Sequence, residues 1–110
     1  MITAKKLKEL VQEFIRLEKD EGIDSTEWAY VALEPDLIAS QEVTLEYLQS
    51  ISKEEFITLG ENGWFEHILS HFKSTEIYEV IDLQYVNFFG TDKKTCFYEE
   101  YIADLKCYVK

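Results

Sequence analysis

The stretch SKEEFITLGENGWFEHILSHF, residues 52–72, indicates the fold class. It opens with Ser52-Lys53-Glu54-Glu55, the spacing of a capping box that starts a helix. Gly60 and Gly63 are expected to bracket a turn after that helix. The apolar residues that follow the turn recur at helical spacing: Trp64, Phe65, Ile68, Leu69 and Phe72. The stretch therefore predicts two short helices joined by a glycine-containing turn.

Helical spacing continues towards the N-terminus. Residues 3–20 carry an apolar stripe that predicts an amphipathic helix, and Gly22 is placed to end it. A second helix is expected from about Ser25 to Glu34, stopping before Pro35, which suits the first turn of another short helix. A further stripe before the capping box predicts one more helix: Val43, Tyr47, Leu48 and Ile51.

The same pattern extends to the C-terminus. Ser74 or Thr75 is expected to cap a helix that runs to Gly90. The last helix has the most regular stripe: Tyr98, Tyr101, Ile102, Leu105, Tyr108 and Val109. No segment alternates apolar and polar residues as a half-buried strand would. We therefore predict an all-α single domain over residues 1–110, a compact array of six to seven short, mostly antiparallel amphipathic helices.

The composition limits the classes of partner. With 22 acidic and 11 basic residues, the chain of 110 residues has a net charge of −11. Phosphate groups would be repelled, so neither nucleic acid nor an anionic membrane surface is expected as a partner. Hydrophobic residues make up 46 % of the chain, enough for a packed core and against intrinsic disorder.

The negative charge is concentrated in the middle of the chain. Residues 20–82 hold fifteen acids and two bases, a net charge of −13. Two interpretations remain open, a solubilising surface and a surface matched to a basic protein partner. We expect Trp64, beside the glycine turn, to be partly exposed. The residues predicted to bind a partner are Asp24, Glu27, Trp28, Glu54, Glu55, Glu61, Trp64 and Glu66.

Few residues suggest catalysis or metal binding. His67 and His71 are spaced to share a helix face, but boundary histidines without a metal are the commoner case. Cys96 and Cys107 lie about 16 Å apart along a continuous helix, too far for a disulfide. They are expected to be reduced and to pack as small hydrophobic residues. We expect no enzyme activity, no cofactor and no bound metal.

No secretory signal and no membrane-spanning segment is recognised, so a cytoplasmic protein is expected. The longest uncharged apolar run has six residues, Trp28 to Leu33, against the roughly 20 that a membrane span needs. The oligomeric state is not indicated by the sequence.

A resemblance adds to this interpretation. Residues 59–69, LGENGWFEHIL, together with Trp28-Ala29-Tyr30, resemble small acidic helical bacterial domains. Their turn reads Leu-Gly-x-Gly-x-x-Glu-x-Leu-Leu, whereas two residues separate the glycines here. Some of these domains look like immunity proteins of toxin systems, including contact-dependent inhibition, and by analogy Gly63 and Glu66 would be structural or interface positions. The resemblance implies an inhibitor that binds a basic toxin domain; the alternative is a helical protein–protein adaptor.

Overall fold

The computed structural model describes residues 2–22, 40–90 and 92–109, and these form six helices and no strand. The predicted helix from Ser25 to Glu34 and the one starting at Pro35 lie outside the described residues. The all-α prediction is confirmed. The helices are α1 (Ala4–Glu21), α4 (Gln41–Gln49), α5 (Lys53–Glu61), α6 (Trp64–Phe72), α7 (Thr75–Phe89) and α8 (Cys96–Lys106).

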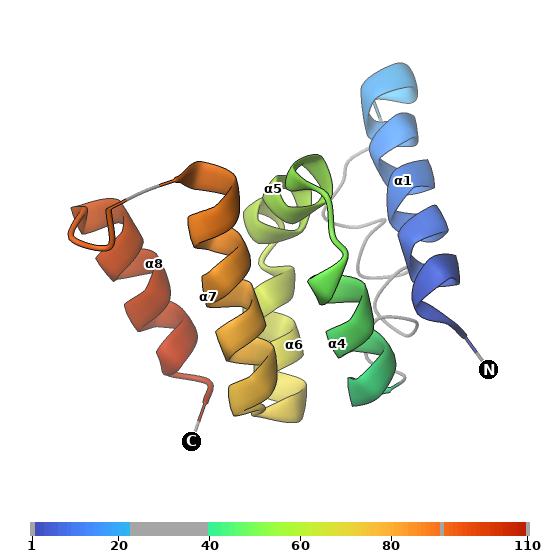
Figure 1. Cartoon of the computed structure of the whole chain (residues 1–110). Coiled ribbons are helices and arrows are strands. Elements are labelled where there is room, and N and C mark those ends of the chain that lie inside the picture. The colour runs from blue at the N-terminus through green and yellow to red at the C-terminus, as the bar shows by residue number, and fades with distance from the viewer. Residues whose placement is uncertain (1, 23–39, 91, 110) are drawn as a thin grey trace.

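The helices form two layers. Figure 1 shows α1, α4, α7 and α8 in a row with α6 behind it, while α5 is seen nearly end-on above α6 and runs from the row to the second layer. Neighbours in this row are in contact, so α7 packs between α4 and α8 although α4 is distant from both in sequence. α6 contacts both α7 and α8 from the second layer. Each helix therefore buries one apolar face between the layers, as amphipathic helices require.

Three hydrogen bonds, from two glutamine side chains, show that α4 and α7 run in the same direction. At one end, Gln41 Nε2 donates to Ser74 Oγ at 3.0 Å. At the other end, Gln84 Nε2 donates to the carbonyl oxygens of Leu48 and Gln49 at 3.0 and 3.1 Å. The expected alternation of direction holds for α6, α7 and α8 in Figure 1, but this central pair is parallel. Between α4 and α7 the chain forms α5 and α6, which return it to the end of the molecule where α4 began. α7 therefore begins beside the start of α4.

Side-chain caps begin five of the six helices. Each N-cap side chain accepts a hydrogen bond from the backbone N–H of the third residue of its helix, and the caps are Thr3, Ser40, Ser52, Ser74 and Thr95. The capping box of Ser52 and Glu55 is confirmed in both of its hydrogen bonds. These local signals explain why the helix starts were predictable.

Gly60 and Gly63 bracket the turn between α5 and α6, as predicted: the Gly63 N–H donates to the Gly60 carbonyl oxygen at 3.2 Å. Gly60 also belongs to the last turn of α5, and only Asn62 and Gly63 separate the two helices. Gly63 has φ 73°, in the left-handed region that costs an L side chain free energy. This tight turn brings the start of α6 directly onto the core, and Trp64 is buried there.

The core lies between the two layers and draws on every described helix. Its largest fully buried side chains are Trp64, Tyr47, Phe14, Phe65, Leu7, Leu48, Leu59, Ile68, Leu69 and Ile77. Leu7 and Phe14 belong to the predicted stripe of the first helix. The stripes mark most of the buried faces correctly, but the last one was drawn too long: α8 ends at Lys106, and Tyr108 beyond it is exposed.

The two glycines near the turn should respond to alanine in opposite ways. Gly63→Ala is expected to lower the free energy of unfolding by about 1 kcal/mol, because Gly63 has a left-handed backbone. Gly60→Ala is expected to raise it by up to about 1 kcal/mol, because Gly60 is helical and a Cβ there meets atoms no closer than 3.5 Å. Urea unfolding of the two variants measures both effects. A loss at Gly60 equal to that at Gly63 would contradict the assignment of the turn.

Candidate functional site

The eight residues predicted to bind a partner do not form one surface. Asp24, Glu27 and Trp28 lie outside the described residues. Of the other five, Glu54 and Glu61 are exposed. Glu54 forms an ion pair with Lys19 of α1, and both side chains are more than half exposed.

Glu55 is buried, contrary to the expectation that it faces a partner. Its side chain is 1 % exposed because it closes the capping box at the start of α5. Its Oε2 accepts from the backbone N–H of Ser52 at 3.4 Å and from the Tyr47 hydroxyl at 3.3 Å. Burial, and then the neighbouring Glu55 carboxylate, raise the pKa of Tyr47 well above its usual value. Glu55 is therefore a structural residue that joins α4 to α5.

The expectation that Trp64 is partly exposed is also wrong. Its side chain is 0 % exposed, because the first turn of α6 points into the core. Its indole packs edge to face against the ring of His67, with 5.7 Å between ring centroids. Glu66 is half-buried, and its Oε2 has no hydrogen-bond partner among the described residues. Neither residue presents the open surface that the sequence suggested.

A different set of acids lies together on the outside of the molecule. Glu42 and Glu46 occupy the face of α4 opposite its buried residues, and Glu76 and Glu79 do the same on α7. Because α4 and α7 pack side by side and in parallel, these four carboxylates share one outer surface, which we call the acidic face. None of the four forms an ion pair with another described residue.

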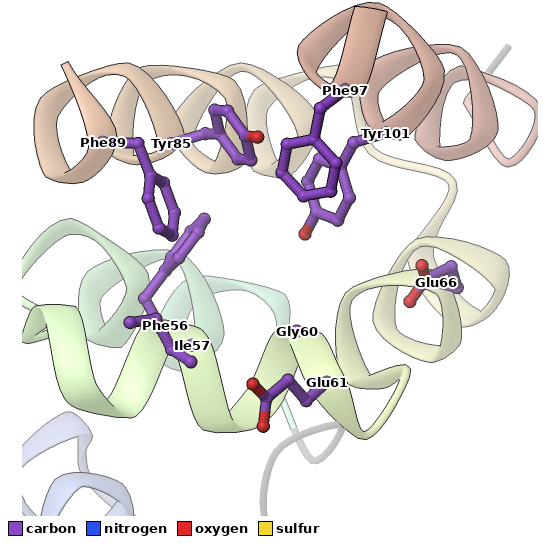
Figure 2. Close-up of a pocket in the computed structure, with 9 residues that line it drawn as sticks. All are labelled: Phe56, Ile57, Gly60, Glu61, Glu66, Tyr85, Phe89, Phe97 and Tyr101. Atoms are coloured by element: carbon purple, nitrogen blue, oxygen red, sulfur yellow. The ribbon is translucent and has the colours of Figure 1, made fainter. Parts of the chain in front are cut away.

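The second candidate site is a hollow between α5, α6, α7 and α8 with a volume of about 440 Å³. We call it the aromatic pocket. Figure 2 shows rings from α7 and α8 on one side and α5 on the other. The residues that line it are Phe56, Ile57, Gly60, Glu61, Glu66, Tyr85, Phe89, Phe97 and Tyr101. The volume falls in the range of small-ligand sites in proteins, roughly 300–1,000 Å³.

The rings of the pocket hold one another in place. Tyr85 stacks on Tyr101 with 5.1 Å between centroids, and it also contacts Phe89 at 4.8 Å and Phe97 at 5.9 Å. Phe97 is 65 % exposed, the largest exposed fraction among the large hydrophobic side chains of the described residues. One side of the pocket is therefore a wall of aromatic rings in contact with one another, and Phe97 at its edge is exposed.

Polar atoms inside this wall lack partners. The hydroxyl oxygens of Tyr85 and Tyr101 are buried and, like Glu66 Oε2, form no hydrogen bond with a described residue. Burial raises the pKa of Tyr85. Burial, and then the nearby Glu66 carboxylate and Tyr85, raise the pKa of Tyr101. Each unpartnered oxygen carries a desolvation cost, which a bound group able to donate hydrogen bonds would reduce.

The histidines and cysteines do not gather into a site. His67 is half-buried, whereas His71 is exposed and contacts Phe72 edge to face. Within the described ranges, no three His, Cys, Asp or Glu side chains are grouped so as to hold a metal ion. Cys96 and Cys107 are free thiols, but both are exposed, so the expectation that they pack as small hydrophobic residues is wrong. They lie at the two ends of α8, beyond its buried centre.

The aromatic pocket was missed in the sequence. Tyr85, Tyr98 and Tyr101 belong to apolar stripes that predict core helices, and such stripes do not distinguish a filled core from a lined hollow. One signal was present. Phe97 stands next to Tyr98 but outside the stripe of its helix, so the helical pattern alone places this large ring at the surface.

Two tyrosine substitutions should have opposite effects on stability. Tyr101→Phe is expected to raise the free energy of unfolding by about 1 kcal/mol at neutral pH, because it removes a buried hydroxyl without a partner. Tyr98→Phe is expected to lower it by about 2 kcal/mol, because the Tyr98 hydroxyl donates to the Asp82 carboxylate. Chemical denaturation measures both, and a clear loss in Tyr101→Phe would show that its hydroxyl has a partner.

The raised tyrosine pKa values predict a loss of stability at alkaline pH. Unfolded tyrosines ionise near pH 10. The folded chain holds the Tyr98 and Tyr101 protons to higher pH, because both hydroxyls are shielded from water and raised in pKa. Stability is therefore complete below about pH 10 and falls as the pH rises towards the folded values.

The Tyr98→Phe/Tyr101→Phe double variant should show a shallower fall in the free energy of unfolding between about pH 9 and pH 11.5. Tyr108→Phe, at an exposed position, is the matched control. Equal slopes for the double variant and the control would contradict the prediction.

Comparison with protein-family models finds no matching family, and comparison with curated proteins and with solved structures finds no similar protein. Among the described helices, none combines the length and the apolar character required to span a bilayer. The acidic face and the aromatic pocket are therefore the two features of this chain that bear on its function.

Proposed function

We propose that the chain is a stoichiometric inhibitor of the immunity-protein class, which binds a basic toxin domain in the cytoplasm and blocks it. The proposal assigns no reaction to the chain. Its effect is to cover the partner's surface, with carboxylates in the place of the negative groups of the partner's substrate. The acidic face is the observation that carries this proposal.

The arrangement of the acidic face supports a binding role over a purely solubilising one. Glu42 and Glu46 are four residues apart on α4, and Glu76 and Glu79 are three apart on α7, so each pair lies on one side of its helix. Like charges at these spacings destabilise a helix by a few tenths of a kcal/mol. None of the four gains an ion pair in return within the described part of the chain. A basic partner would relieve this repulsion.

An apolar residue beside the acids fits a protein partner. Leu83 is 58 % exposed and lies one turn beyond Glu79 on the same side of α7. Protein interfaces combine an apolar centre with charged groups around it. Leu83 therefore offers the hydrophobic contact for which the sequence suggested Trp64.

The charge of the acidic face should determine how fast the partner associates and how salt changes that rate. Complementary charge raises the association rate, and added salt shortens the reach of that attraction. Affinity capture from the native host, followed by mass spectrometry, supplies the partner for a kinetic measurement with purified proteins. Raising the salt from about 0.05 M to about 0.5 M should slow association at least about tenfold.

Neutralising the acidic face should have a similar effect at low salt. The variant Glu42→Gln/Glu46→Gln/Glu76→Gln/Glu79→Gln should associate about tenfold more slowly and lose most of its salt dependence. The matched control is Glu99→Gln/Glu100→Gln/Asp104→Asn, which neutralises exposed acids on α8. Association that ignores both salt and the four substitutions would overturn the electrostatic mechanism.

A functional assay separates the inhibitor from the adaptor. An equimolar amount of the chain should abolish the partner's toxicity when the two are co-expressed. A partner that binds through the acidic face but has no toxic activity would favour the adaptor and contradict the immunity proposal.

A further inference from the structure

We propose that the aromatic pocket receives the guanidinium group of an arginine side chain presented by the basic partner. The inference rests on the proposed function for the source of that arginine, and on the pocket itself for the chemistry.

The charge of the residues that line the pocket favours a cationic ligand. Two carboxylates, Glu61 and Glu66, line the pocket, and no basic side chain does so among the described residues. Lys53, on α5, already places its ammonium 5.7 Å from the centroid of the Phe89 ring. A cation over a ring of this wall is therefore compatible with the geometry. An anionic ligand would meet the two carboxylates and a chain of net charge −11.

The unpartnered oxygens of the pocket favour a ligand that donates hydrogen bonds. Tyr85, only 2 % exposed, contributes a buried hydroxyl, and Tyr101 and Glu66 each contribute another buried oxygen. In Figure 2 the hydroxyl of Tyr101 points into the space between the helices, and that of Tyr85 points toward Phe97. All three oxygens can accept hydrogen bonds. A purely apolar ligand would leave them unsatisfied.

The guanidinium group matches both features at once. It is planar, it carries five N–H donors, and it stacks on aromatic faces. An ammonium group is compact and more strongly hydrated, so it gains less from a pocket with several flat rings. The pocket edge is accessible to a partner's side chain, because Phe97, Phe89 and Glu61 are exposed. Among cationic side chains, arginine therefore fits best.

The pocket and the acidic face are separate enough to be tested independently. Along α7, Glu76 precedes Phe89 by thirteen residues, a rise of about 20 Å. One basic partner of ordinary size could contact both, but substitutions at one site leave the other intact.

The pocket chemistry is tested first with the isolated chain and N-acetyl-arginine amide. In an NMR titration, amide signals of α5–α8 near the pocket should shift, with a dissociation constant on the order of 1 mM. N-acetyl-citrulline amide has the same shape without the charge, and it should bind about tenfold more weakly. The lysine and norleucine amides should also bind more weakly. Equal binding of the arginine and citrulline compounds, or no binding of either, would overturn the inference.

Variants then locate the binding. Phe97→Leu keeps apolar bulk but removes an exposed ring, and Glu66→Gln keeps shape but removes a charge; each should weaken arginine amide binding by about threefold to tenfold. Tyr108→Leu and Glu99→Gln are the matched controls, outside the pocket, and should bind as the unmodified chain does. Phe97 is mostly exposed, so its variant tests the inference even where Glu66→Gln disturbs folding. Unchanged binding in Phe97→Leu would contradict the inference.

The source of the arginine is tested with the captured partner. Phe97→Leu should increase partner dissociation about tenfold, whereas the acidic-face variant should mainly slow association. Loss of binding in the acidic-face variant alone would overturn this inference and leave the proposed function standing. A second outcome is that arginine amide binds but affinity capture yields no basic protein. That result would overturn the proposed function and the protein source of the arginine. The pocket would then be a site for free guanidinium compounds.

Discussion

The buried carboxylate of Glu55 is the contact that joins α4 to the start of α5. Its oxygen Oε2 accepts from Ser52 N–H at the start of α5 and from the Tyr47 hydroxyl of α4. One side chain thus starts a helix and ties it to the preceding one. The direction of α5 that results places Phe56 and Gly60 opposite α7 and α8, where they form one side of the aromatic pocket.

α7 connects the two candidate surfaces. Its first half carries Glu76 and Glu79 of the acidic face, and its second half carries Tyr85 and Phe89 of the aromatic pocket. α7 is held against α4 by hydrogen bonds from Gln41 and Gln84 and lies between α4 and α8. A fifteen-residue helix fixed in this way gives both surfaces a rigid base, which lowers the entropy cost of binding.

Much of the fold could be predicted because helix formation leaves local marks. The capping box at Ser52, the cap at Ser74 and a 3.6-residue apolar period located the described helices. The candidate site was harder to predict, because an acidic residue near a helix start either faces solvent or caps the helix. Glu54 stays exposed, whereas Glu55, the next residue, is buried as the third residue of the capping box. The exposure of Trp64 was wrongly predicted because a glycine turn does not record which side of the following helix meets the core, and the first turn of α6 faces inward.

The sequence by itself determined the presence of the described helices, most of their apolar faces and the concentration of acids between residues 20 and 82. These depend on interactions between residues a few positions apart. Only the tertiary structure decided that α4 and α7 are parallel neighbours, which brings four acids onto one face. Only it brought rings from α5, α7 and α8 around one hollow. Contacts between distant helices depend on how whole faces pack, and a local pattern does not record which faces meet.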